Sequence, residues 1–192
     1  DEKFTEASPF RPSSPYSASK AAADLAVAAW NRTFGVSASI THAANNFGSG
    51  QHVEKFLPRM IHLATSGLPL ELYGTGKNMR DWLYVDDHSR AVFLAATNAL
   101  GGFQRFTVSA GQLFSNLEIA EHINLLTGQP KGRVVFVDDR PGHDLKYSSS
   151  ATKAAAQLGW RAEGPPLFDW LRGEIASRNS LGSASSSLPP ES

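Results

Sequence analysis

The sequence predicts one globular unit with an α/β fold and no strongly charged binding surface. Three observations support these expectations in turn. Segments typical of strands alternate with segments typical of helices along most of the 192 residues. Hydrophobic residues make up 41% of the chain, which is enough for one globular unit with a core. Lys and Arg total 18, as do Asp and Glu, so no basic surplus points to nucleic acid or to an anionic membrane surface.

Several classes of protein are disfavoured by composition. The chain has no cysteine, which argues against disulfides and thiolate metal sites and favours a cytoplasmic location. It has no apolar run long enough for a membrane span, and its six histidines show no metal-ligand spacing, so we expect no membrane and no metal. A Gly-x-Ser-x-Gly elbow and a Walker loop are also missing, which argues against hydrolases and NTPases.

The first predicted helix covers Pro15–Phe34. Ser14 suits the N-cap, Pro15 suits the first helical position, and Gly35 suits the residue after the end. Because apolar residues occur nearly all around this helix, we expect it to be buried on more than one side. Core burial is the favoured interpretation, and packing against a second subunit is the alternative.

The remaining elements follow from the same kinds of signal. A buried strand at 36–44 runs into polar residues 45–50, where ligands of open α/β sheets bind. Ser115 and Glu118 form a capping box before a helix. Gly74 and Gly76 lack the third glycine of a dinucleotide fingerprint and predict only a turn. Further helices are expected at 54–66, 86–99, 116–128, 151–158 and 167–178, further strands at 70–73, 82–85, 103–109 and 133–137, and a disordered tail at 179–192.

Tyr16 and Lys20 are the strongest candidates for chemistry. They fall one turn apart on the same face of the first predicted helix. A tyrosine with a pKa of about 10 is a weak base at neutral pH, and a nearby ammonium lowers that pKa by stabilising the phenolate. The pair would then take a proton from a sugar or alcohol hydroxyl while hydride leaves its carbon. For the pair alone an ordinary solvated helix face is the commoner explanation, and the flanking serines and proline favour the chemical one.

Cationic and amide side chains recur at three other places: after the strand at 36–44, before the strand at 82–85, and on the turn at 139–144. An arginine fork suits a diphosphate, and the asparagine amides offer both donors and acceptors at the end of a strand. Each place also has a plainer explanation, as a turn former or a surface ion pair. These candidates are Asn45, Asn46, Lys55, Arg80, Arg140 and His143.

Seven blocks carry a resemblance to a known family over about residues 4–175: FTE (4–6), PSSPYSASKAAAD (12–24), NNFG (45–48), EKFLP (54–58), LYGTG (72–76), RDWLYVDDH (80–88) and DRPGHD (139–144). In this order they resemble the extended short-chain dehydrogenase/reductases. Tyr-x-x-x-Lys and RDWLYVDD are shared among nucleotide-sugar epimerases and decarboxylases. PSSPYSASK together with DRPGHD is narrower and is similar to the dTDP-glucose 4,6-dehydratases.

The resemblance implies a fold, a reaction and roles for named residues. The fold is the C-terminal part of an NAD-binding Rossmann fold plus a small α/β substrate-binding subdomain. In such enzymes the glucosyl C4 of dTDP-glucose is oxidised, water is lost across C5 and C6, and hydride returns to C6. Tyr16 is implied as the base for the 4-hydroxyl, Lys20 as the residue that lowers its pKa and holds the nicotinamide ribose, and Asn45 as a further NAD contact. The implied nucleotide-sugar ligands are Asn46, Lys55, Phe56, Tyr73, Arg80, Asn116, Arg140 and His143.

The same resemblance implies an organisation and a partner. Residues 1–50 and 80–110 correspond to the remaining part of the dinucleotide-binding domain, and residues 51–79 and 111–178 to the nucleotide-sugar subdomain. A homodimer through the Pro15–Phe34 helix is expected.

The sequence departs from the family in two respects. Glu71 stands where the family usually has proline, and an acid there either weakens nucleotide affinity or points to solvent. The Gly-rich phosphate turn and the Thr-Asp-Glu set of the elimination step are both missing, and the chain starts at Asp1 without methionine. We therefore expect part of a longer dehydratase that is inactive alone. The alternatives are a non-catalytic nucleotide-binding fragment and a UDP-sugar epimerase or decarboxylase.

Overall fold

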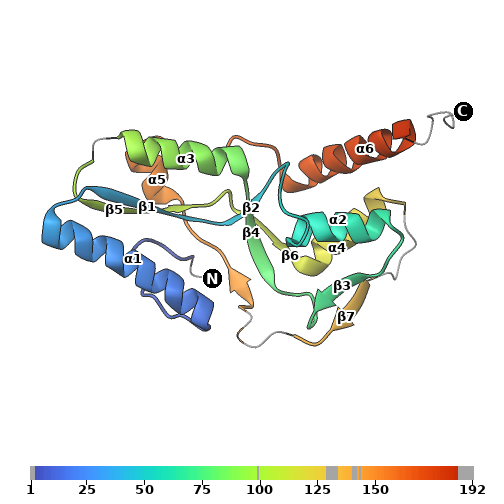
Figure 1. Cartoon of the computed structure of the whole chain (residues 1–192), viewed down its shortest axis with the longest axis horizontal. Coiled ribbons are helices and arrows are strands. Elements are labelled where there is room, and N and C mark those ends of the chain that lie inside the picture. Colours follow the sequence, from blue (N-terminus) through green and yellow to red (C-terminus); the bar gives the residue numbers. More distant parts are fainter. Residues whose placement is uncertain (1–2, 99, 129–133, 140–141, 143, 186–192) are drawn as a thin grey trace, which may run out of the picture.

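The computed structural model describes residues 3–98, 100–128, 134–139, 142 and 144–185, without the side chains of 179–185. Figure 1 shows two groups of elements joined in the middle by β2 (Asn45–Phe47) and β4 (Met79–Tyr84). No helix in these described ranges is both long enough and apolar enough to cross a membrane.

The first group is a small parallel sheet with helices on both faces. β1 (Ala38–Ala43) pairs in parallel with β5 (Phe103–Val108). Figure 1 shows α3 (Val85–Thr97) and α5 (Thr152–Leu158) on one face and α1 (Pro15–Phe34) on the other. The core of this first group lies on the side of the sheet covered by α3 and α5. Its buried residues include Ala44, Leu83, Ala91, Phe106, Val108, Leu158 and Trp160.

The second group is built around β4. This strand pairs in parallel with β2 and β8 (Lys146–Tyr147) and antiparallel with β6 (Gln112–Ser115). A separate parallel pair consists of β3 (Leu70–Tyr73) and β7 (Val134–Val137).

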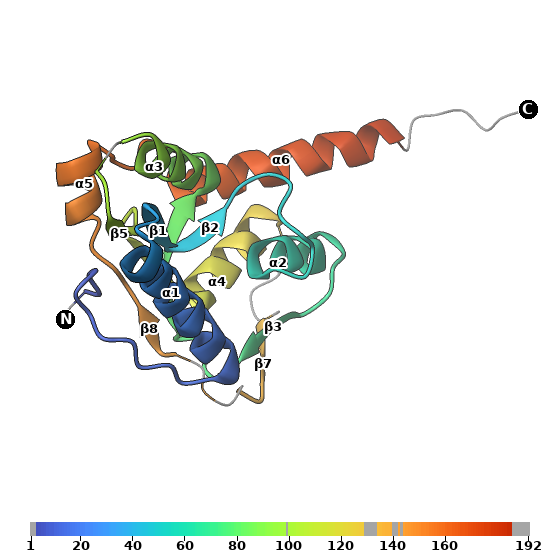
Figure 2. The ribbon, with the colours of Figure 1, turned by 60° about the vertical axis from the view of Figure 1, so that its left-hand side comes forward.

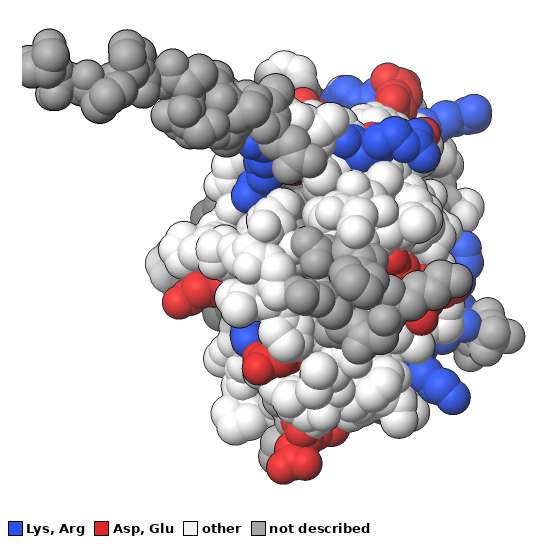
Figure 3. Space-filling model, turned by 90° about the vertical axis from the view of Figure 1, so that its right-hand side faces the viewer, with Lys and Arg blue, Asp and Glu red and all other residues white. Residues whose placement is uncertain are grey.

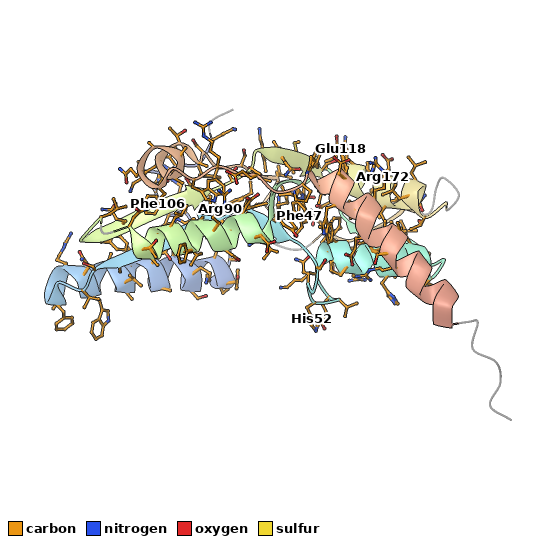
Figure 4. The ribbon with its side chains drawn as sticks, turned by 90° about the horizontal axis from the view of Figure 1, so that it is seen from above. Phe47, His52, Arg90, Phe106, Glu118 and Arg172 are labelled. Atoms are coloured by element: carbon orange, nitrogen blue, oxygen red, sulfur yellow. The ribbon has the colours of Figure 1, made fainter. Side chains whose placement is uncertain are left out.

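Three helices pack on the second group: α2 (Phe56–Thr65), α4 (Asn116–Leu126) and α6 (Leu167–Ser185). The predicted capping box of α4 is present, because Glu118 N donates to Ser115 Oγ while Ser115 N donates to Glu118 Oε2. Figure 4 shows Phe47 and Phe106 well apart along the molecule, and they belong to the two separate cores. The buried residues of the second core include Phe47, Leu57, Ile61, Leu70, Trp82, Ile119, Ile123 and Leu171.

The bounds predicted for α1 and β3 are confirmed, but the predicted burial of α1 is wrong. None of residues 15–34, all of which the structure describes, is buried, and Leu25, Trp30 and Phe34 are 59–65% exposed. The reason lies in the sheet: among the described residues β1 pairs only with β5, so α1 overlies the free edge of a narrow sheet. Its larger apolar residues Leu25, Trp30 and Phe34 therefore face solvent in this chain, whereas Ala21, Val27 and Ala28 are half-buried.

Two other expectations are corrected. The predicted disordered tail does not begin at residue 179, because α6 continues through Ser185. Its first turns are anchored by buried Leu167, Leu171 and Ile175, and extending an existing helix costs far less than starting one. The sequence also failed to predict β2, β6 and β8, which have only two to four residues each, too few for a hydrophobic period to be visible.

Candidate functional site

The first two turns of α1 present Tyr16 and Lys20 to solvent. Ser14 caps the helix: Ser17 N donates to Ser14 Oγ at 3.2 Å, and Ser14 N donates to Ser17 Oγ at 3.0 Å. This capping box and Pro15 at the first helical position fix the orientation of the turn. Tyr16 is 74% exposed and Lys20 is exposed as well, so both polar ends are open to a ligand.

The start of α1 lies against the loop between β7 and β8. Ser13 Oγ is 3.4 Å from the carbonyl oxygen of Gly142 and 3.4 Å from Asp144 Oδ1. Gly142 has a φ of +71°, and a Cβ placed on it would lie 2.9 Å from the carbonyl oxygen of Ser13. The PSSPYSASK and DRPGHD blocks, far apart in sequence, therefore meet in space.

Arg80 belongs to the same region. Its Nη2 donates to the carbonyl oxygen of Asp144 at 2.8 Å, and Asn78 Nδ2 donates to the same oxygen at 3.1 Å. Asn116 N in turn donates to the carbonyl oxygen of Asn78 at 3.1 Å. Two predicted nucleotide-sugar ligands, Arg80 and Asn116, are thus brought together at the start of β4.

Asn46 lies in a polar chain that crosses three elements. Its Nδ2 is 3.1 Å from His88 Nδ1 on α3, and His88 Nε2 is 3.3 Å from Thr41 Oγ1 on β1. Burial lowers the pKa of His88, which favours the neutral ring. Gln51 Nε2 donates to the carbonyl oxygen of Asn46 at 3.1 Å.

A cavity of about 190 Å³ lies beside this chain, and Asn46, Gly48, Gln51 and Val85 are among its lining residues. The side-chain oxygens Asn46 Oδ1 and Gln51 Oε1 are buried and have no hydrogen-bond partner among the described residues. A buried acceptor without a donor costs about 1–3 kcal/mol. Because neither oxygen has appreciable accessible surface, both lie behind the wall of the cavity and are not open to a ligand inside it.

The other predicted ligands are more dispersed. Lys55 is exposed at the N-cap of α2, and Phe56 is half-buried with its ring 6.2 Å from that of Trp82. Tyr73 is 40% exposed at the end of β3, and Asn45 is exposed at the start of β2. Arg140 and His143 lie outside the described residues.

Glu71 is engaged at the surface. Its Oε2 is 2.8 Å from Arg59 Nη2, and both side chains are nearly half exposed. Such exposed pairs contribute little to stability. Glu71, which stands where the resemblance implies proline, therefore directs its carboxylate toward Arg59 on α2.

Sequence reasoning missed four residues of this region: Ser13, Gln51, His88 and Asp144. Ser13, His88 and Asp144 stand inside three of the family blocks, so their positions were visible, but their partners depend on tertiary contacts. In the described part of the chain no group of three or more His, Asp or Glu side chains could hold a metal ion. Over the face seen in Figure 3, basic and acidic side chains are interspersed with uncharged areas.

Comparison with known proteins agrees with this arrangement. The family model of the NAD dependent epimerase/dehydratase family matches residues 1–109. A dTDP-glucose 4,6-dehydratase of Haemophilus influenzae is 43% identical over 171 residues, which is 83% of this chain and 50% of that protein. The chain thus spans about half the length of this curated relative.

Solved structures give the same picture. The crystal structure of DesIV, a dTDP-glucose 4,6-dehydratase of Streptomyces venezuelae with NAD bound, has a TM-score of 0.88 and 35% identity, over 95% of this chain and 56% of that chain. MoeE5 in complex with UDP-glucose and NAD has a TM-score of 0.84 and 28% identity, over 94% of this chain and 61% of that one. The chain belongs to the NAD dependent epimerase/dehydratase family.

Proposed function

We propose that this chain is the base-carrying and nucleotide-sugar-binding part of a dTDP-glucose 4,6-dehydratase. The observation that carries the proposal is the contact of Ser13 with Gly142 and Asp144, because it holds the start of α1, the helix that carries Tyr16 and Lys20, against the DRPGHD block. The identity to the Haemophilus influenzae dehydratase over 83% of the chain supports the same assignment.

NAD is the proposed cofactor, and the donors on α1 and β2 fit it. An exposed phenol, an exposed ammonium and an exposed amide at Tyr16, Lys20 and Asn45 match the hydroxyl and amide groups of a nicotinamide riboside. The crystal structure of DesIV, which this chain resembles, contains bound NAD. When bound, NAD supplies a hydride acceptor that also returns the hydride.

Residues of this chain would accept the proton of the sugar and hold the sugar in position. Tyr16 takes the proton of the sugar 4-hydroxyl, and the Lys20 cation one turn away favours the phenolate form that can accept it. The side chains predicted to hold the nucleotide-sugar fix the sugar relative to Tyr16, which turns proton transfer into a step within one complex. They are Asn46, Lys55, Phe56, Tyr73, Arg80, Asn116, Arg140 and His143.

We also propose the division into a dinucleotide part, 1–50 and 80–110, and a nucleotide-sugar part, 51–79 and 111–178. The two separate cores support it for most of the chain. Two places depart from it: Ala154, Leu158 and Trp160 pack in the core that contains Phe106, and Phe47 and Trp82 pack in the core of the second group.

A homodimer through α1 is proposed as well. Trp30 and Phe34 contact each other with their ring centroids 4.8 Å apart and leave an apolar patch exposed at the end of α1, and Leu25 is exposed on the same helix. A cytoplasmic location stays a prediction from the lack of cysteine.

The activity is tested with a chimera that joins the upstream half of the Haemophilus influenzae relative to this chain. We expect the chimera to form the 4-keto-6-deoxy sugar from dTDP-glucose and the chain alone, supplied with NAD, to form none. Tyr16→Phe in the chimera should lower turnover by at least 10²-fold while NAD binding is retained, since general base catalysis contributes about 10²–10⁴-fold. Turnover by the chain alone, or an unaffected Tyr16→Phe chimera, would contradict the proposal.

The UDP-sugar alternative is favoured by one observation, the fold shared with MoeE5 in complex with UDP-glucose and NAD. Titrating the chain with dTDP and with UDP separates the two assignments. Tighter binding of dTDP supports the dehydratase, and tighter binding of UDP supports an epimerase or decarboxylase. Arg140→Ala serves as the control, because losing a diphosphate ligand should weaken both nucleotides equally.

A further inference from the structure

We infer that Asn78, a buried residue directly before β4, is a positioning residue that holds the Arg80 guanidinium in the orientation in which it binds a diphosphate. This inference rests on the proposed function, since it takes Arg80 as a ligand of the nucleotide-sugar. It adds a residue that acts on Arg80 through a backbone oxygen and is itself only 2% exposed, too enclosed to contact a ligand.

Asn78 and Arg80 share one acceptor, the carbonyl oxygen of Asp144. Asn78 Nδ2 donates to this oxygen at 3.1 Å, and Arg80 Nη2 donates to it at 2.8 Å. A carbonyl oxygen has two lone pairs, so it can accept both hydrogen bonds at once. The two side chains are therefore coupled through a single backbone atom.

Arg80 has a second backbone acceptor on its own strand. Its Nη1 donates to the carbonyl oxygen of Met79 at 2.8 Å. Because the guanidinium is planar and rigid, two fixed donors define the plane in which its other N–H groups lie. One acceptor belongs to β4 and the other to the loop between β7 and β8. The orientation of Arg80 therefore depends on where that loop holds the Asp144 carbonyl.

Asn78 fixes this carbonyl independently of Arg80. Met79 N donates to the carbonyl oxygen of Leu145 at 2.8 Å, which keeps the next residue of the loop in register with β4. The Asn78 amide adds a bond to the Asp144 oxygen itself. Since the Asn78 side chain is buried, water cannot easily take the place of its N–H. Without that N–H, the Asp144 carbonyl could turn and carry the guanidinium with it.

The backbone of Asn78 makes a separate link. Its carbonyl oxygen accepts from Asn116 N at 3.1 Å, at the start of α4. Asn78 thus joins three segments that carry predicted nucleotide-sugar ligands: β4, the start of α4 and the DRPGHD block. A substitution at position 78 removes the side-chain link and keeps the backbone link, so an experiment can separate the two.

The first test is a double-mutant cycle on nucleotide affinity in the 192-residue chain. Asn78→Ala should weaken dTDP binding by up to about tenfold, the effect of one neutral hydrogen bond, and leave the binding of thymidine, which has no diphosphate, unchanged. In an Arg80→Lys background Asn78→Ala should have no further effect, because lysine lacks the planar fork that Asn78 orients. Equal losses of dTDP affinity in the two backgrounds would overturn the inference.

The second test needs no nucleotide. In the ¹⁵N-arginine-labelled chain the two Nη groups of Arg80, identified by their absence in Arg80→Lys, should give separate NMR signals, since each is bound to a carbonyl oxygen. In Asn78→Ala these signals should broaden and merge. The Met79 and Asn116 amides should keep their slow hydrogen exchange, because their backbone bonds remain. Separate Arg80 signals in Asn78→Ala, or merged signals in the unaltered chain, would overturn the inference.

Two further variants serve as controls. Asn78→Leu has a branched side chain of similar shape without an N–H, so it should reproduce the loss of dTDP affinity, and full affinity in this variant would overturn the inference. Thr107→Val removes the buried hydrogen bond of Thr107 Oγ1 to Glu6 Oε1 on β5 and should lower the free energy of unfolding without changing dTDP affinity. If it weakened dTDP binding as much as Asn78→Ala, lower stability would explain both losses and the inference would fail.

The outcomes separate this inference from the proposed function. If the unaltered chain binds dTDP but the two substitutions of the cycle act independently, Asn78 is merely structural and the inference fails while the function stands. If the unaltered chain does not bind dTDP, the proposed function fails. The assignment of Arg80 to a diphosphate then fails with it, whatever the NMR result.

Discussion

Ser13 and Gly142 are in contact although 129 residues separate them in sequence. The Ser13 hydroxyl reaches the Gly142 carbonyl oxygen at 3.4 Å, and the Ser13 carbonyl oxygen lies where a side chain at position 142 would begin. The contact joins the turn that carries Tyr16 to the loop that precedes β8. Any change that separates these two residues should therefore affect the ligand site before it affects the cores.

Gly142→Ala should weaken the site in this way. The residue has a φ of +71°, and its new Cβ would lie 2.9 Å from backbone oxygen, which cannot move without α1. We expect weaker dTDP-glucose binding in a titration, together with a loss of about 1–2 kcal/mol in the free energy of unfolding from the left-handed backbone.

Gly128→Ala is the matched control for that substitution. Its φ is +67°, but a Cβ there meets nothing within 4 Å. It should show the same backbone cost in urea unfolding and unchanged dTDP-glucose affinity. Equal binding losses in the two variants would mean that the Ser13 contact does not shape the site.

Asp24→Ala should loosen α1 from the sheet. Asp24 Oδ2 pairs with His42 Nε2 on β1, and the two side chains are only 17% and 25% exposed. Because α1 buries none of its residues, we expect this largely buried pair to be a main anchor, worth about 1.5–3 kcal/mol. Hydrogen exchange of α1 amides should accelerate while that of α3 stays unchanged.

Glu71→Ala provides the comparison for Asp24→Ala. It breaks the Arg59 pair, which is nearly half exposed, and should cost at most about 1 kcal/mol. If both substitutions have the same small effect on the free energy of unfolding, α1 is held by something other than Asp24.

The sequence predicted local structure well where local signals were complete. The N-cap at Ser14, the proline after it and Gly35 defined α1 at both ends, and Ser115 with Glu118 defined the start of α4. It predicted poorly where structure depends on neighbours. The exposure of Leu25 and Trp30 follows from the width of the sheet beneath α1, which no periodicity within the helix reveals.

The candidate site shows the same contrast between features set by local sequence and features set by tertiary packing. Residue types and motif spacing identified Tyr16, Lys20, Asn46 and Arg80, but not their partners. Arg80 was weighed as a surface partner of an acid, whereas its Nη2 bonds the backbone oxygen of Asp144, a contact between β4 and a loop 64 residues away. Such partners are set by tertiary packing and carry no spacing signal.

Acidification should destabilise the fold from about pH 6.5 downward. Burial lowers the pKa of His88, and burial together with nearby Arg172 lowers that of His122. Between the lowered folded-state pKa and the ordinary value of about 6.5, the unfolded chain binds more protons, so the free energy of unfolding falls as pH falls. The loss is complete once the pH is below the folded-state pKa values.

Urea unfolding at pH 8 and pH 5 measures this dependence. His122→Phe should keep the ring that stacks 4.2 Å from Phe168 while removing the titrating group, so its difference between the two pH values should be smaller than that of the unaltered chain. A difference as large as in the unaltered chain would exclude His122 as a source of the acid sensitivity.

Glu6→Ala should destabilise the first core although Glu6 lies far from it in sequence. Glu6 Oε1 accepts hydrogen bonds from Thr107 N at 2.7 Å and Thr107 Oγ1 at 2.9 Å, and Thr107 is 4% exposed on β5. Without the carboxylate, the buried Thr107 N–H loses its acceptor, at a cost of about 1–3 kcal/mol in the free energy of unfolding.

Glu6→Gln and Glu54→Ala sharpen that experiment. The glutamine keeps an oxygen for Thr107 and should recover much of the stability, whereas Glu54 is 84% exposed beside His52 and its removal should change the free energy of unfolding by less than about 0.5 kcal/mol. An equal loss of stability in Glu6→Gln and Glu6→Ala would mean that the charge of Glu6, and not its acceptor oxygen, holds this segment to β5. The segment has a second attachment, the bridge between Phe4 and Ser149. Stability unchanged in all three variants would mean that the Phe4 bridge alone keeps it in place.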